Sequence, residues 1–302
     1  MHSRFLSCVF GALLFVQATP TIAAEEEIRL EHAGLTINAN LVAAQDGWQD
    51  GTVVLVTHGT TGHYGMEIIT SLQSLLAEQG LTSLAPNLSL GLDDRHGAYD
   101  CAVPHAHRHT DALDEIGVWV DWLKTKGVKD LVLLGHSRGG NQTAWFAAER
   151  PDPVVSGVVL VAPATWSEAY AKNDYEKRFA TELDPLLKRA EALVAAGTGD
   201  EWMEDTGFIY CPDAKVQAQS FVSYHAPEPR MDTPSLLDKI KVPVLVIAGT
   251  EDEVVPDVAE KVEPYADGKR VRLEVIEGAD HFFRDLNADE VVEFVKAFAD
   301  EL

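Results

Sequence analysis

The sequence predicts an α/β protein in which helices flank a mostly parallel central sheet. Short apolar runs typical of buried strands alternate with amphipathic stretches typical of helices along most of the chain. At residues 131–148 an apolar run passes into a helical pattern through Gly135-His136-Ser137-Arg138-Gly139. So short a turn would hold Ser137 in a strained conformation and present its hydroxyl at the C-terminal edge of the sheet.

Length, composition and charge limit the class of protein. The chain has 302 residues, of which 46% are hydrophobic, and is therefore long enough to bury a full core. Its 48 acidic and 24 basic residues give a net charge of -24. Such an excess of acid argues against nucleic acid or an anionic membrane surface as the partner. We interpret it as a contribution to solubility.

Residues 1–24 have the pattern of an export signal. A short polar start that includes Arg4 precedes an apolar run at 5–16, and small residues follow as far as Ala24. The apolar run is too short to span a bilayer comfortably. We expect a signal peptide at 1–24, a periplasmic or secreted mature protein, and no stable membrane insertion after cleavage. An uncleaved anchor is the alternative.

Removal of this segment leaves Cys101 and Cys211 as the remaining cysteines. Exported proteins fold in an oxidising environment, so we expect a disulfide between the two. Two unpaired thiols are the alternative, because a sequence does not give the distance between them.

The first part of the core is expected at residues 25–163. Alternating apolar residues on both sides of Gly34 indicate an opening antiparallel hairpin. Apolar runs and helical periodicity then predict the remaining elements in order. Strands are expected at 52–56, 81–88, 131–134 and 154–162, and helices at 66–79, 111–126 and 141–148.

An irregular stretch at 89–110 contains the alternating imidazoles His105, His107 and His109. Metal ligands often have such spacing. No cysteine or carboxylate cluster accompanies these histidines in the sequence, so we expect them to lie in a solvated loop. A metal site is the alternative.

Residues 164–233 differ in character from the core, because strong strand patterns are missing and charged and aromatic residues become frequent. We expect a helical cap inserted between two core strands, with a helix at 175–196. Two or three of the cap's aromatic side chains should contact a substrate, from the set Trp166, Tyr170, Phe179, Trp202, Phe208, Tyr210, Phe221 and Tyr224.

The second part of the core is expected at 234–302, with strands at 242–248 and 271–276 and helices at 258–265 and 290–299.

A serine hydroxyl becomes a useful nucleophile when a histidine accepts its proton and an acid orients that histidine. In a parallel sheet all three groups should come from loops at the C-terminal ends of strands. The strand at 242–248 is followed by Asp252, and the strand at 271–276 by His281. The chain order is therefore Ser137, then an acid among Glu251, Asp252 and Glu253, then His281.

With these motifs the chain resembles the α/β-hydrolase superfamily from the opening hairpin to the last helix. In that family the acid lies in G-x-x-D-x-x-V-P and the base in G-x-x-H. The matching residues are Gly249, Asp252, Val255 and Pro256 for the first pattern, and Gly278 and His281 for the second.

The resemblance implies that Ser137 is a nucleophile, His281 its base and Asp252 the acid. It also implies that the backbone N–H groups of Thr60 and Arg138 form an oxyanion hole. We therefore expect an exported serine hydrolase that cleaves a small-molecule carboxylic ester through an acyl-enzyme, without a metal or an organic cofactor. The alternatives are an amidase or peptidase, a lactonase or an acyltransferase on the same residues, and a ligand-binding protein that is not catalytic.

Overall fold

The computed structural model describes residues 24–302. One sheet dominates it, and each of its strands lies close to a predicted position. The strands are β1 Ala24–His32, β2 Leu35–Ala43, β3 Val53–Thr57, β4 Thr82–Asn87, β5 Leu131–His136, β6 Val155–Val161, β9 Val244–Gly249 and β10 Val271–Ile276.

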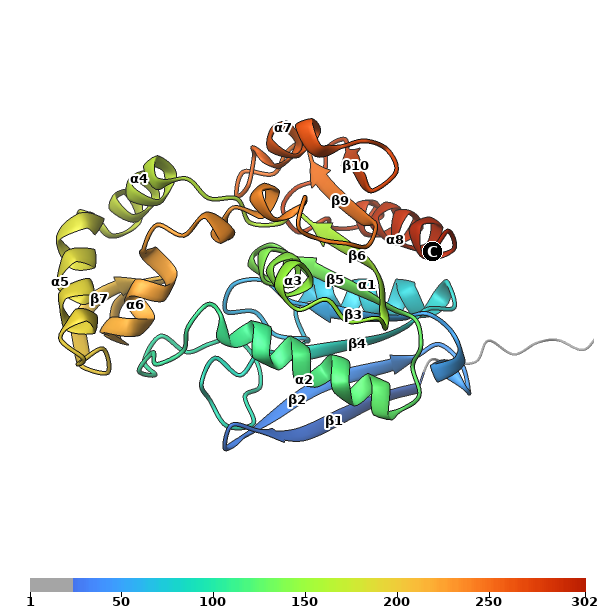
Figure 1. The fold of residues 1–302 in the computed structure, drawn as a ribbon, viewed down its shortest axis with the longest axis horizontal. Helices are drawn as coiled ribbons and strands as arrows, with labels where there is room; N and C mark the ends of the chain where they lie inside the picture. Colours follow the sequence, from blue (N-terminus) through green and yellow to red (C-terminus); the bar gives the residue numbers. More distant parts are fainter. Residues whose placement is uncertain (1–23) are drawn as a thin grey trace, which may run out of the picture.

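The 8-stranded sheet has the order β1-β2-β4-β3-β5-β6-β9-β10 (Figure 1). From β4 onward neighbouring strands are parallel, whereas β1 pairs antiparallel with β2 and β2 pairs antiparallel with β4. The opening hairpin and the mostly parallel sheet are therefore confirmed.

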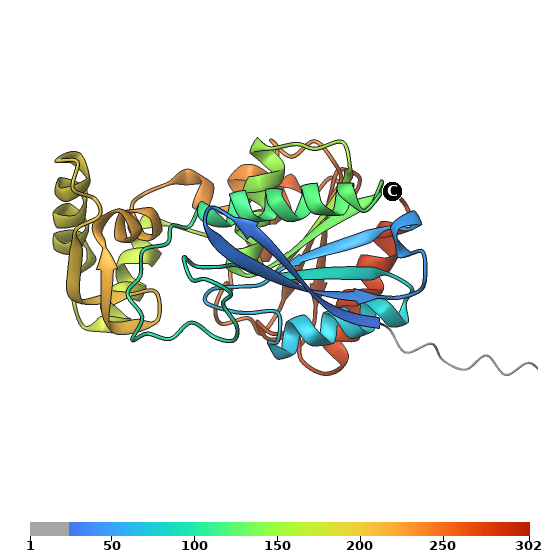
Figure 2. The same cartoon turned by 90° about the horizontal axis from the view of Figure 1, so that it is seen from below.

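Helices cover both faces of this sheet (Figure 1, Figure 2). On one face α1 Glu67–Glu78 packs against α8 Leu286–Ala299, and on the other α2 Asp111–Thr125 packs against α3 Arg138–Glu149. The short helix α7 Val258–Val262 connects β9 to β10. Because helices cover both faces, β3 and β5 are buried along their whole length. This explains why both strands begin with apolar runs, at 53–56 and 131–134.

The segment between β6 and β9 forms a second body at one end of the sheet (Figure 1). It has its own buried apolar cluster, centred on Tyr175, Phe208 and Phe221. We call residues 164–233 the cap, as in the sequence prediction. Its elements are α4 Glu168–Phe179, α5 Leu183–Ala195, β7 Trp202–Phe208, β8 Cys211–Gln217 and α6 Ala218–His225.

Inside the cap, the single helix predicted at 175–196 is wrong. Ala180 adopts a left-handed backbone with φ 51°, and its N–H donates to the carbonyl of Glu176, which ends α4. Pro185 then lies in the first turn of α5, where a missing N–H breaks no helical hydrogen bond. The sequence also does not predict the antiparallel pair β7 and β8, whose residues are partly exposed and include Gly207 and Pro212.

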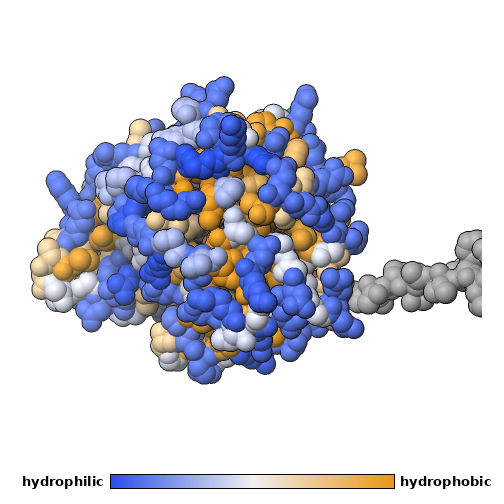
Figure 3. Space-filling view, turned by 45° about the vertical axis from the view of Figure 1, so that its right-hand side comes forward, coloured by the Kyte–Doolittle hydropathy of each residue, from blue (hydrophilic) through white to orange (hydrophobic). Residues whose placement is uncertain are grey.

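The surface agrees with the acidic composition. The face drawn in Figure 3 is mostly hydrophilic, with apolar residues exposed in separate patches. Among the helices of residues 24–302, none is both long enough and apolar enough to cross a membrane. Residues 1–23 of the predicted signal peptide lie outside the described part of the chain.

Candidate active site

Ser137 occupies a strained turn between β5 and α3. Its backbone has φ 57° and ψ -126°, a conformation that residues with side chains rarely adopt. A Cβ added at Gly135 would lie 2.4 Å from the carbonyl oxygen of Gly139, and one at Gly139 would lie 2.2 Å from the carbonyl oxygen of His58. Glycine is needed at both positions, because the backbone segments approach too closely for any side chain.

Three polar side chains from different loops meet at this turn. The Nε2 atom of His281 lies 2.9 Å from Oγ of Ser137, and its Nδ1 atom lies 2.8 Å from Oδ2 of Asp252. Asp252 follows β9 and His281 follows β10, so both reach the sheet edge at which Ser137 follows β5. The exposed fractions are only 9% for Ser137, 4% for Asp252 and 6% for His281, so little water competes with these hydrogen bonds.

Asp252 is held as a carboxylate. Its Oδ1 atom accepts hydrogen bonds from the backbone N–H groups of Val254 and Val255 at 2.7 and 2.9 Å. Burial alone would raise the pKa of Asp252, but the hydrogen bonds from His281 and Val255 outweigh burial and lower this pKa. A carboxylate beside Nδ1 keeps the proton on that nitrogen and leaves Nε2 as an acceptor for the hydroxyl proton of Ser137. The rival acids Glu251 and Glu253 are exposed.

The loop after β3 lies directly against the serine. A Cβ added at Gly59 would lie 3.0 Å from Cβ of Ser137. Thr60 and Arg138 line the same cavity as Ser137. Within residues 24–302, neither the backbone N–H of Thr60 nor that of Arg138 has a hydrogen-bond acceptor. Two such N–H groups beside a nucleophile can donate to the negative oxygen that forms during acyl transfer.

Arg95, which the sequence does not single out, supports this loop. Its buried guanidinium donates to the carbonyl oxygens of Leu88, Gly97 and Gly62 at 2.7, 2.6 and 2.8 Å. The loop after β3 and the loop after β4 are thereby joined. His58 adds a further link, since its Nε2 atom accepts the N–H of Leu88 at 3.1 Å. Hydrogen bonds from a side chain to backbone carbonyls leave no pattern in the sequence, so the role of Arg95 could not be predicted.

A cavity of about 160 Å³ lies between Ser137 and the cap. Aromatic side chains form much of its wall, and five from the predicted set contribute: Trp166, Tyr170, Phe179, Tyr210 and Tyr224. Tyr175, which is not in that set, also lines the cavity. Phe208 and Phe221 instead belong to the cap's own core, and Trp202 is partly exposed.

The prediction of a solvated histidine loop is wrong, because His105, His107 and His109 have exposed fractions of 0%, 1% and 1%. They belong to the loop after β4 and pack against the cap, where His105 stacks on Tyr99 and contacts Phe208 edge-on. Burial lowers the pKa of His107 and of His109 to about 3, so both are neutral at pH 7. Within the described residues, no group of three or more His, Cys, Asp or Glu side chains could hold a metal ion.

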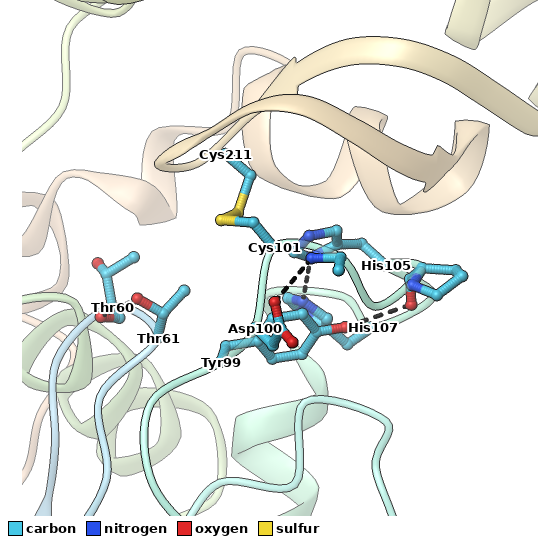
Figure 4. The surroundings of a disulfide bond; sticks show 10 residues. Thr60, Thr61, Tyr99, Asp100, Cys101, His105, His107 and Cys211 are labelled. Atoms are coloured by element: carbon cyan, nitrogen blue, oxygen red, sulfur yellow. Dashed lines mark hydrogen bonds between the residues drawn. A yellow bond between two sulfur atoms is a disulfide. The ribbon is translucent and has the colours of Figure 1, made fainter.

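A disulfide joins Cys101, in the loop after β4, to Cys211 at the start of β8 (Figure 4). Next to it the N–H of His105 donates to the carbonyl of Lys215 at 2.7 Å, and the carbonyl of His105 accepts the N–H of Gln217 at 2.9 Å. The core and the cap are therefore connected covalently and through backbone hydrogen bonds.

The family model described as the alpha/beta hydrolase family matches residues 53–294. The chain belongs to this family. No protein with a curated description matches it.

Several solved structures share the fold. Est1E from Butyrivibrio proteoclasticus is 21% identical, with a TM-score of 0.63, and the match covers 91% of this chain and 98% of that chain. DcsB, in complex with its substrate analogue, is 16% identical, with a TM-score of 0.67 and coverage of 92% and 99%. An esterase from Pyrococcus furiosus is 17% identical, with a TM-score of 0.60 and coverage of 92% and 91%.

Proposed function

We propose that the protein is a serine hydrolase that cleaves a carboxylic ester of a small molecule through an acyl-enzyme. The observation that carries this proposal is the hydrogen-bonded series Asp252, His281 and Ser137, with distances of 2.8 and 2.9 Å. Membership of the alpha/beta hydrolase family and the likeness to structures of esterases support it.

In the proposed reaction, Oγ of Ser137 attacks the ester carbonyl while Nε2 of His281 takes the hydroxyl proton. The resulting oxyanion accepts hydrogen bonds from the N–H groups of Thr60 and Arg138. The C–O bond to the alcohol then breaks, and His281 gives its proton to the departing alcohol. His281 next deprotonates a water molecule, which attacks the acyl group. The C–O bond to Ser137 then breaks, His281 gives the proton to Oγ of Ser137, and the carboxylic acid leaves.

The cavity favours small substrates. Its volume of about 160 Å³ is close to that of an engineered protein cavity of about 150 Å³ that accepts benzene. We therefore expect p-nitrophenyl acetate and butyrate to be cleaved faster than p-nitrophenyl esters of long-chain acids. A preference for long chains would contradict this substrate size.

A fluorophosphonate probe tests the proposal, because it reacts with an activated serine. The wild-type protein should be labelled and Ser137→Ala should not. Ser137→Ala should also lower ester turnover by roughly 10³-fold or more with an unchanged circular dichroism spectrum. Absence of both labelling and turnover in the wild type would favour the ligand-binding alternative, whereas faster cleavage of amide or lactone substrates would favour the other enzyme classes.

We also propose that the protein is exported to the periplasm or secreted. The Cys101–Cys211 disulfide supports this, because disulfides persist mainly in oxidising compartments. Expression of the full chain in bacteria, followed by fractionation and N-terminal sequencing, should give an exported protein that begins after Ala23 or Ala24. An uncut protein in the membrane fraction would indicate an anchor.

A further inference from the structure

The side chain of Arg138 lines the cavity together with Ser137. Its Nε atom donates to Oγ1 of Thr60 at 2.9 Å, its Nη1 atom lies 3.4 Å from Nδ1 of His109, and its guanidinium carbon lies 5.2 Å from the ring centre of Tyr224. A guanidinium has five N–H donors, and the two hydrogen bonds use two of them. Among the described residues, the other three N–H groups have no partner.

His109 holds this guanidinium without neutralising it. The Nδ2 atom of Asn141 donates to the carbonyl of Arg230 and to Oγ1 of Thr233, so its Oδ1 atom faces Nε2 of His109 at 3.0 Å. An amide oxygen only accepts, and therefore Nε2 of His109 carries the proton and Nδ1 is the acceptor for Arg138. Burial, and secondly the charge of Arg138, lower the pKa of His109 to about 3, which keeps it uncharged at neutral pH.

Other cations engage the carboxylates near this part of the cavity. Asp174, which lines the cavity, accepts hydrogen bonds from Arg178 at 3.0 and 2.9 Å. Glu228 pairs with Arg230 at 2.8 Å. Within residues 24–302 the ion pairs do not include Arg138, so its charge in the cavity is uncompensated.

We infer that Arg138 binds an anionic group of the substrate, and that the substrate is an ester with a carboxylate a few bonds from the reacting carbonyl. A monoester of a short dicarboxylic acid has this chemistry. The planar fork of a guanidinium matches a carboxylate through two parallel N–H···O bonds. The short separation follows from the adjacency of Arg138 to Ser137 and from the cavity volume of about 160 Å³. This inference rests on the proposed ester hydrolysis and specifies its substrate class.

Monomethyl glutarate and dimethyl glutarate form a matched pair of substrates, because only the first has a free carboxylate. Acid release at constant pH gives kcat/KM for each ester. The wild-type protein should prefer the monoester by about 10-fold or more, and Arg138→Gln should remove most of this preference, as expected for a charged bidentate contact. Arg138→Lys should retain part of the preference, since it keeps the charge and loses the fork.

The control variant is Arg150→Gln, which removes the same charge at the far end of α3. Arg150 pairs with Asp114 on the surface and lies outside the cavity, so the preference for the monoester should be unchanged. Equal rates for the two esters in the wild type would overturn the inference. An equal loss on both esters in Arg138→Gln would also overturn it, and would assign to Arg138 only the positioning of the loop that carries Thr60.

A failure of the proposed function itself has a different signature, namely no fluorophosphonate labelling and no cleavage of either ester. In that case calorimetry with glutarate tests the anion site directly. The wild-type protein should bind glutarate and Arg138→Gln should bind it at least about 10-fold more weakly. Absence of binding to the wild type would overturn the inference.

Discussion

At Ser137 a strained backbone, two close backbone approaches and a hydrogen bond coincide in one residue. A left-handed conformation costs about 1–3 kcal/mol for a residue with a side chain and persists only where the surroundings impose it. Here Gly135 and Gly139 let neighbouring backbone segments close around the turn. The orientation of the hydroxyl toward His281 is thus fixed before any substrate binds.

The role proposed for Asp252 can be tested by a change that preserves its size. Asp252→Asn replaces an oxygen beside Nδ1 of His281 with an amide, which permits the wrong tautomer of the imidazole. We expect ester turnover to fall by roughly 10⁴-fold. Glu251→Gln and Glu253→Gln change exposed carboxylates and should leave turnover unaltered. Steady-state kinetics would reassign the acid if either glutamine variant lost as much activity as Asp252→Asn.

Among the elements, those buried on both faces could be predicted from the sequence. The covered strands β3 and β5 each begin with four apolar residues, as expected where helices exclude water from both faces of a sheet, so both could be predicted. The loops that carry Asp252 and His281 could be located because polar loop residues after parallel strands share one sheet edge. The choice of Asp252 over Glu251 and Glu253 came from the resemblance to the α/β-hydrolase pattern. The structure brings Asp252 and His281 to Ser137.

The cap could be predicted only coarsely, because its order depends on long-range contacts. The end of α4 at Ala180 depends on a left-handed residue that is not glycine, and β7 and β8 depend on pairing with each other. His105 is buried because Tyr99 and Phe208, from distant segments, enclose it. Hydrophobic periodicity along the sequence does not show contacts between distant segments. Pro185 is a sign in the sequence that the predicted long helix contains a second helix start.

The disulfide connects elements whose cysteines are separated by 110 residues in the chain. Closing so long a loop restricts the unfolded chain, so Cys101→Ser/Cys211→Ser should lose about 2–4 kcal/mol of unfolding free energy in urea titrations. The wild-type protein in dithiothreitol should match this double variant, and dithiothreitol should not affect the variant. Equal stability of the oxidised wild type and the double variant would contradict the prediction.

For the whole molecule, many imidazoles are buried uncharged. Burial is the main cause that lowers the pKa of each, to about 3 or about 4, in the set His58, His105, His107, His109, His136 and His225. These groups titrate near 6.5 when unfolded, so between the two values the unfolded chain binds more protons. Their stabilising contribution is complete above pH 6.5 and is lost as the pH falls. Glu115, Asp111 and His96 act in the opposite direction, because burial raises the pKa of Glu115 to about 7 and also raises that of Asp111, and the hydrogen bond to Glu27 raises that of His96. The six buried imidazoles outnumber them.

We therefore expect the free energy of unfolding to decrease between pH 7 and pH 5. The slope should exceed the value for one proton, about 1.4 kcal/mol per pH unit, because several imidazoles contribute. Urea titrations at intervals across this range give the slope directly. A stability that is constant or rises toward pH 5 would contradict the burial of these imidazoles as neutral groups.

The connectivity of the sheet also determines when a newly made chain can carry out the proposed hydrolysis. His281 follows Ser137 by 144 positions, and the cap and β9 are translated between them. The strand that delivers the imidazole, β10, is the final one of the sheet to emerge from the ribosome. A chain that stops before β10 would thus carry an inert alcohol at position 137, and the proposed hydrolytic activity would arise only after β10 and His281 have been made.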